Sequence, residues 1–134
     1  RVEDPWLWGL FRHQGADAWV KPVGQGGVPI LGDAAHPTLP FLAQGASMGL
    51  EDAWVLAQSL ATHDTPAAAL AAYQSARKPR TTRIVAAANA NARAYHLSGL
   101  PRMIGHTGLR LLGRFSPGMM LSRFDWLYDH DVTQ

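Results

Sequence analysis

The sequence predicts an α+β fold in which short strands are followed by a helical tail. Composition supports this, because the first third of the 134 residues is rich in Gly, Pro and Trp and the rest is rich in Ala, Leu and Arg. Short apolar segments bounded by turn residues occupy the first part, as expected for strands. Apolar residues spaced three and four apart begin near Gly45, as expected for helices.

The first expected strand is Trp6–Arg12, which is short, aromatic and bounded by Pro5 and a His-Gln-Gly turn. Trp6 and Trp8 would then point to the same side of it. Residues 18–20 form a second, shorter candidate strand.

A glycine-rich turn and a buried strand should follow. Gly24–Gly27 has turn composition. Val28–Leu31 predicts a brief buried strand ending at Gly32, and Pro29 should lie at its entry or edge because it cannot donate a ladder hydrogen bond. Residues 33–44 contain two prolines and no helical or strand periodicity, which predicts a structured loop.

The first helix should begin near Gly45 and end near residues 63–64. Its apolar residues recur at spacings of three and four, which places them on one stripe of the helix. The stripe comprises Leu50, Ala53, Trp54, Ala57, Leu60 and Ala61.

The second helix should start with Thr65 as N-cap and Pro66 as its first residue, and run to about residue 96. Pro79 should kink or split it. Residues 103–115 predict a third helix, and residues 119–127 a short fourth one.

Composition excludes several classes of protein. The net charge is only +2, and the only dense basic cluster is Arg77, Lys78, Arg80 and Arg83, so we expect no nucleic-acid partner. Without Cys there is no disulfide scaffold or thiolate metal site, and the six His show no metal-ligand spacing, so we expect no metal. The longest uncharged run, residues 34–50, is interrupted by prolines and does not predict a membrane span. No signal-peptide pattern opens the sequence, so we expect a cytoplasmic location and no membrane partner.

The most informative segment is ILGDAAHPTLPFLAQGAS, residues 30–47. Asp33 follows a strand, where ligands of α/β folds bind, and its carboxylate could hold hydroxyls of a sugar-like chain. The N–H groups of Gly45, Ala46 and Ser47 would be free donors at a helix N-terminus, which favours negative charge. The alternative is a plain strand–turn–helix connection in which Asp33 caps the turn and Ser47 caps the helix.

This segment resembles the second flavin-binding motif of the flavin-dependent aromatic hydroxylases, of the p-hydroxybenzoate hydroxylase and salicylate hydroxylase type. The similarity covers GDAAHPTLPFLAQGASMGLEDAWVLAQSLA, continues with Leu70, Tyr73, Arg77 and Pro79-Arg80, and includes the closing DWLYDHD. It implies a fragment of the FAD/NAD(P)-binding α/β fold. Residues 1–44 would supply strands and the Gly-Asp flavin-binding loop, and residues 45–134 a helical C-terminal region.

The resemblance also implies FAD as the cofactor. Gly32 and Asp33 would bind it, with Asp33 on the ribityl hydroxyls. Pro40 would lie against the reactive edge of the isoalloxazine. The backbone of Gly45, Ala46 and Ser47 would contact the pyrimidine edge, and such backbone contacts survive the family's frequent Asn in place of Ser47.

For the parent enzyme, the resemblance implies hydroxylation of an aromatic or related small molecule with O2 and either NADH or NADPH. In that family this sheet faces the substrate, which makes Trp6 and Trp8 substrate-contact candidates.

The family's N-terminal G-x-G-x-x-G is not matched, because Gly24 and Gly26 are followed by Pro29 at the sixth position. We therefore expect the C-terminal part of a longer enzyme, starting abruptly at Arg1. Alone it should be inactive and bind FAD weakly or not at all. Its partners would be the N-terminal FAD-binding portion and, through uncovered apolar surface, a second copy. The alternative is a non-catalytic truncated or association module.

Gly45–Gly49 also matches G-x-S-x-G, and Asp125 and His130 follow in the order of a serine hydrolase. The proline-rich loop before Ser47 argues against it, because a nucleophile elbow follows directly on a strand.

Other polar residues are expected to be structural. His36 should brace the loop, and Glu51 and Asp52 should pair with arginines of the next helix. Arg77, Arg80 and Arg83 would share one face of that helix.

Overall fold

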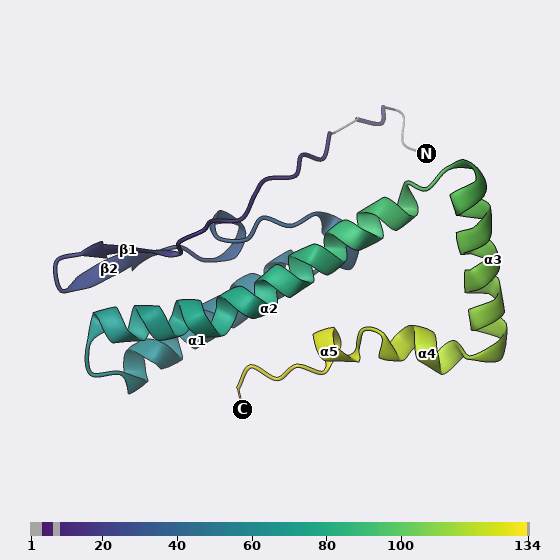
Figure 1. The fold of residues 1–134 in the computed structure, drawn as a ribbon. Coiled ribbons are helices and arrows are strands. Elements are labelled where there is room, and N and C mark those ends of the chain that lie inside the picture. Colours follow the sequence, from purple (N-terminus) through teal and green to yellow (C-terminus); the bar gives the residue numbers. More distant parts are fainter. Residues whose placement is uncertain (1–3, 7–8, 134) are drawn as a thin grey trace.

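The structure is a computed structural model that describes residues 4–6 and 9–133. Two strands, β1 (Val20–Val23) and β2 (Gly26–Pro29), precede two 3₁₀ turns, η1 (Gly32–Ala34) and η2 (Pro40–Leu42). The helices that follow are α1 (Gly45–Thr62), α2 (Pro66–Tyr95), α3 (Gly99–Phe115), α4 (Pro117–Ser122) and α5 (Asp125–Tyr128). Strands followed by a helical tail confirm the α+β prediction (Figure 1).

β1 and β2 form an antiparallel hairpin in which Val20 pairs with Pro29 and Val23 with Gly26. Gly24 has a φ of +57°, a left-handed conformation that glycine adopts without strain. The Ile30 N–H continues the pairing with a 2.8 Å hydrogen bond to the Trp19 carbonyl. The turn is thus shorter than predicted, since two of the four residues assigned to it belong to β2.

The prediction of a strand over Trp6–Arg12 is wrong for the residues that the structure describes. Residues 9–12 have no regular structure, and Trp8 lies outside the described residues. Aromatic composition favours a strand, but a strand also needs a neighbour to satisfy its backbone groups. Within the described part of the chain, the only sheet is the hairpin of β1 and β2.

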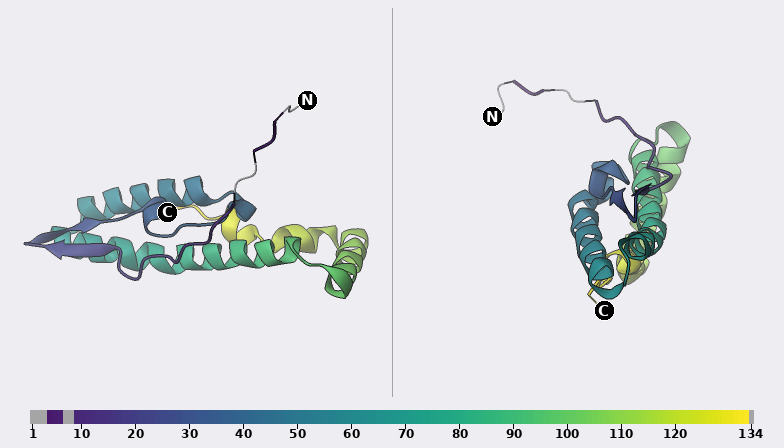
Figure 2. Two further views of the ribbon diagram at one scale, coloured as in Figure 1. Left: turned by 90° about the horizontal axis from the view of Figure 1, so that it is seen from above. Right: turned by 90° about the vertical axis from the view of Figure 1, so that its left-hand side faces the viewer.

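α1 and α2 lie side by side as an antiparallel pair joined by a short turn (Figure 2). As predicted, Thr65 is the N-cap of α2, where its hydroxyl accepts a 3.3 Å hydrogen bond from the Ala68 N–H. Pro66 is the first residue of α2, as predicted. Pro79 does not split α2, which is continuous over 30 residues.

The core has two clusters, both between α2 and the elements packed on it. Trp19, Ala35 and Tyr73 form one, and Leu42, Met48, Ile84, Ala88 and Leu127 form the other. α1 turns Met48, Asp52 and Ser59 toward this core. The predicted apolar stripe of α1 lies on the opposite side and is exposed, including Leu50, Trp54 and Leu60. The polar bonds of Asp52, described below, link the buried side of α1 to η1 and α2.

α3 leaves the far end of α2 and stands at an angle to it, and α4 and α5 return toward the α1–α2 pair (Figure 1). The predicted start of α3 was four residues late, because Pro101 fits the first helical turn, where N–H groups have no helical partner. The predicted fourth helix is divided into α4 and α5. In the described part of the chain, no helix combines the length and apolar character needed to cross a bilayer.

Candidate functional site

Asp33 lies in η1, directly after the hairpin. Gly32 before it has a φ of +58°, so the chain turns sharply as it leaves the paired residues. The Asp33 side chain is exposed, and no group of the described residues donates a hydrogen bond to it. The sequence-predicted carboxylate is therefore free to accept hydrogen bonds from a ligand.

The N-terminus of α1 is also open. Ala43, just before it, has a φ of +52°, a left-handed conformation that costs a residue with a Cβ about 1 kcal/mol or more. The Gln44 side chain does not cap the helix. Among the described residues, the N–H groups of Gly45, Ala46 and Ser47 have no hydrogen-bond acceptor. The strained turn thus presents three backbone donors together with the positive end of the helix dipole.

These donors lie close to Asp33. A Cβ placed on Gly45 would be 3.8 Å from Asp33 Oδ1 and 3.5 Å from Thr38 Cγ2. A carboxylate that accepts and a helix end that donates therefore meet at one surface. A ligand with hydroxyl donors next to an electron-rich carbonyl edge would match both. The exposed Pro40 begins η2 in the loop between them.

A buried carboxylate, Asp52 of α1, holds this loop in place. Its Oδ2 accepts from the Gly32 N–H at 3.0 Å and from His36 Nε2 at 2.5 Å. Its Oδ1 accepts from Arg77 Nε of α2 at 2.8 Å. Burial by itself raises the pKa of Asp52, but the hydrogen bonds from His36, Arg77 and Gly32 outweigh it and hold the pKa below its usual value. Asp52 thus joins η1, α1 and α2 as a carboxylate.

Glu51 forms a second set of ion pairs on the same two helices. It accepts from Arg77 at 2.6 Å, and from Arg80 at 2.9 and 3.1 Å in a two-pronged pair. Burial opposes ionisation of Glu51, but the bonds and charges of Arg80 and Arg77 prevail and lower its pKa. Arg80 also donates to the carbonyls of Trp126 and Leu127 and so fastens α5. These contacts confirm that the acidic pair of α1 binds arginines of α2.

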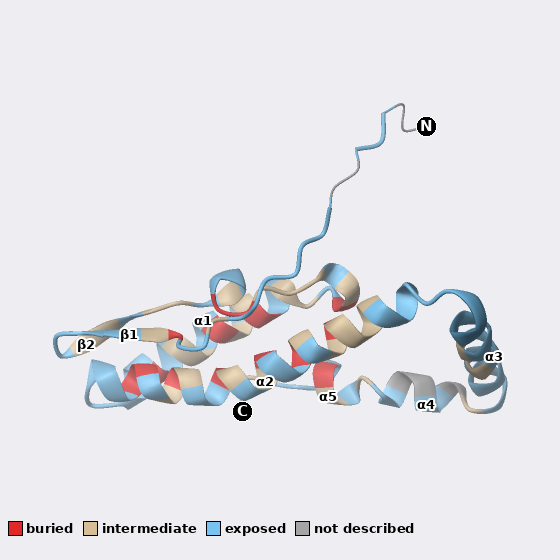
Figure 3. Ribbon diagram, turned by 45° about the horizontal axis from the view of Figure 1, so that its top comes forward, coloured by how far each residue is buried: buried red, intermediate tan, exposed pale blue. Residues whose placement is uncertain are grey.

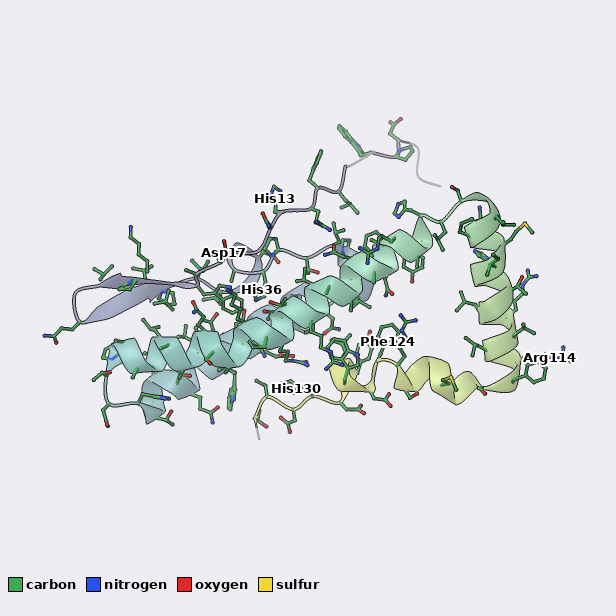
Figure 4. The ribbon with its side chains drawn as sticks, in the orientation of Figure 1. His13, Asp17, His36, Arg114, Phe124 and His130 are labelled. Atoms are coloured by element: carbon green, nitrogen blue, oxygen red, sulfur yellow. The ribbon has the colours of Figure 1, made fainter. Side chains whose placement is uncertain are left out.

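His36 is buried, and it braces the loop as expected. Its ring lies 5.2 Å from that of Trp19, and its Nδ1 is buried without a hydrogen-bond partner among the described residues. His36 also lines a cleft of about 270 Å³ between the Gly15–Asp17 segment and α2. Figure 4 shows His36 at this junction, below Asp17.

Of the two tryptophan candidates, the structure describes only Trp6. Trp6 is 84% exposed and makes no ring contact with a described residue, and Trp8 lies outside the described residues. Their substrate-contact role stays a prediction.

The hydrolase alternative is not assembled either. Ser47 lies in the first turn of α1 and follows η2, not a strand. Within the described residues, no hydrogen bond links Ser47, Asp125 and His130, and all three are exposed.

The sequence alone did not identify Asp52 as the residue that positions Gly32 and His36. Gly32 and His36 precede Asp52 by 20 and 16 residues, and the loop between them has no helical or strand periodicity that would predict these contacts. The only available signal was an acidic pair in α1 followed by arginines in α2, which predicts ion pairs but does not show which backbone they hold.

In a comparison with known protein families, residues 12–88 match the family described as "FAD binding domain". The chain is 41% identical over 98 residues to 3-hydroxybenzoate 6-hydroxylase of Klebsiella oxytoca, covering 72% of this chain and 24% of that protein. It is 36% identical over 128 residues to 3-amino-4-hydroxybenzoate 2-monooxygenase of Streptomyces platensis, covering 94% of this chain and 30% of the relative. It is 35% identical over 135 residues to salicylate hydroxylase of Pseudomonas putida, covering 98% of this chain and 29% of the relative. The chain thus spans less than a third of the length of each of these three relatives.

Proposed function

Because this chain belongs to the FAD binding domain family, among the flavin-dependent aromatic hydroxylases, we propose that it supplies the flavin half of an FAD site in a monooxygenase. The observation that carries the proposal is the meeting of the free Asp33 carboxylate with the open N-terminus of α1 at Gly45. Asp52 links the two groups, because it belongs to α1 and accepts a hydrogen bond from the N–H of Gly32, the residue before Asp33.

The chemistry of these groups fits the flavin half of FAD. Asp33 would accept hydrogen bonds from the ribityl hydroxyls. The N–H groups of Gly45, Ala46 and Ser47 would donate to the pyrimidine edge, where the helix dipole favours the negative charge of reduced flavin. Pro40 would line the reactive edge of the ring. FAD supplies the redox chemistry when bound, and these residues bind it and set its orientation.

The rest of the site would come from polypeptide outside these 134 residues. The exposed apolar stripe of α1, with Leu50, Trp54 and Leu60, supports this proposal because a large apolar face next to a binding site is typical of an interface. We propose that the complete enzyme is cytoplasmic and hydroxylates a small aromatic acid with O2 and NADH or NADPH. The substrate class rests on the hydroxybenzoate and salicylate names of the relatives.

Flavin titration of the 134-residue chain tests the half-site. If only the isoalloxazine and ribityl groups are held, riboflavin, FMN and FAD should bind with similar, weak affinity, and Asp33→Ala should weaken all three equally. FAD binding more than tenfold tighter than riboflavin would show that the ADP half is bound here as well. Unchanged binding by Asp33→Ala would contradict the assignment of Asp33.

The enzyme assignment has a separate test. The reading frame upstream of Arg1 should encode a strand followed by G-x-G-x-x-G, and its absence would overturn the parent-enzyme proposal. The protein encoded by the whole frame should oxidise NADH or NADPH faster when an aromatic acid is added.

A further inference from the structure

α3 is an amphipathic helix whose apolar side is exposed in the described chain. At about 100° per residue, one broad face collects Leu100, Ile104, Leu111, Leu112 and Phe115. All five side chains are exposed, and α3 contains no buried residue. In Figure 3 the helix is almost entirely coloured as exposed.

The charge of α3 has one sign. Arg102, His106, Arg110 and Arg114 recur every four residues, so they form a stripe that winds from the polar side to the edge of the apolar face. Figure 4 shows Arg114 at the end of α3, extending away from the other helices. Among the described residues, no acidic side chain pairs with Arg102, Arg110 or Arg114.

The basic character extends beyond α3. Nine of the 12 Lys and Arg lie in residues 65–124, and this stretch contains no Asp or Glu. Arg77 and Arg80 are neutralised by Glu51 and Asp52 of α1. The helix that projects from the fold therefore has uncompensated positive charge next to exposed apolar side chains.

We propose that α3 docks on an anionic phospholipid surface, lying in the plane of the interface. Leucine, isoleucine and phenylalanine side chains would enter the boundary between headgroups and acyl chains, and the arginines would pair with lipid phosphates. Such a helix lies on a bilayer without crossing it. The expectation of no membrane partner rests on the lack of a spanning segment, and an interfacial helix needs no such segment.

Charge favours a lipid surface over a second copy of the chain. Two α3 helices packed through their apolar faces would bring arginine stripes together, and neither helix contains an acid to pair with them. An anionic bilayer offers apolar volume and negative charge together. No residue of α3 belongs to the proposed flavin half-site, so variants of the two sets of residues test the two proposals separately.

Co-sedimentation of the 134-residue chain with vesicles tests the proposal. The chain should bind vesicles of phosphatidylglycerol and phosphatidylcholine in equal parts, and not vesicles of phosphatidylcholine alone. Added salt should weaken binding, because exposed charges are screened. No binding to the anionic vesicles, or equal binding to both compositions, would overturn it.

The helix provides a matched pair of variants. Leu109 and Leu111 are 54% and 52% exposed, but they lie about 200° apart around α3. Leu111→Asp should reduce vesicle binding at least tenfold, whereas Leu109→Asp on the polar side should change it less than twofold. Arg110→Gln with Arg114→Gln should reduce it about 25-fold, roughly fivefold per arginine. Equal effects of the two leucine variants would contradict an oriented helix.

The alternative partner of α3, a second copy of the chain, predicts a different result. If sedimentation velocity shows a concentration-dependent dimer that Leu111→Asp abolishes, and the vesicles do not bind, α3 is a self-association surface and the lipid proposal is wrong. Circular dichroism should show unchanged helix content in all variants, because no α3 residue is buried.

Discussion

The backbone N–H of Gly32 donates a 3.0 Å hydrogen bond to the carboxylate of Asp52, which is fully buried in α1. This contact links the residue before Asp33 to the helix whose N-terminus forms the other side of the half-site. The groups that would touch FAD are thus separate from the groups that hold them, and mutation can distinguish the two.

Asp52→Ala should destabilise the fold by about 3–5 kcal/mol, because it leaves Arg77 and His36 buried without their shared acceptor. Asp33→Ala should change stability by less than about 0.5 kcal/mol, since Asp33 is exposed and unpaired among the described residues. Urea unfolding monitored by circular dichroism measures both. A large loss of stability in Asp33→Ala would show a structural role for it.

Acid should destabilise the protein through Asp52 and Glu51. Hydrogen bonds overcome burial and hold both folded-state pKa values below their usual values, so the folded chain binds fewer protons than the unfolded chain. Their stabilisation is fully present above the unfolded pKa values of about 4 and is lost as the pH falls through the lower folded-state values. Urea midpoints between pH 6 and pH 3 should decline, and Asp52→Asn should flatten that decline. The control Asp64→Asn should leave the decline unchanged, because Asp64 is exposed. Equal flattening by both variants would show that Asp52 is not a source of the acid sensitivity.

Arg77→Lys should destabilise the fold by about 2 kcal/mol although the charge is kept. The guanidinium reaches Asp52, Glu51 and the Met48 carbonyl at once, and a lysine ammonium cannot span these three acceptors. The matched control is Arg93→Lys on the same helix, where the arginine is exposed. Thermal unfolding of both variants checks this, and equal melting temperatures would show that charge alone matters.

Tyr73→Phe should cost about 1 kcal/mol, because the Tyr73 hydroxyl donates to the Ile30 carbonyl at 3.1 Å. Burial raises the pKa of Tyr73, so this donor stays protonated through the neutral range. Tyr95→Phe is the control, since Tyr95 is 71% exposed and keeps its ring contact with Phe41. Denaturant midpoints of the two variants should differ, and identical values would show that the hydroxyl adds nothing.

Helix positions could be predicted from local sequence signals. Thr65 and Pro66 mark the start of α2 because a hydroxyl cap and an N-terminal proline suit a helix end whatever surrounds it. The start of α1 at Gly45 followed in the same way from the end of the proline-containing loop.

Helix rotation and strand pairing were less predictable. The α1 stripe around Trp54 has the spacing of a core face, yet the core receives Asp52 and Ser59. The segment Trp6–Arg12 has the composition of a strand, but its residues 9–12 have no strand partner among the described residues. Both outcomes depend on what lies opposite in space, which periodicity does not encode.

The sequence by itself determined the fold class, the family resemblance and the candidate groups at Asp33 and Gly45, because these depend on residue type and on spacing along the chain. Only the tertiary structure decided that Asp52 unites Gly32, His36 and Arg77, and that the apolar faces of α1 and α3 are exposed. The physical reason is that a buried carboxylate must gather donors from wherever the fold supplies them.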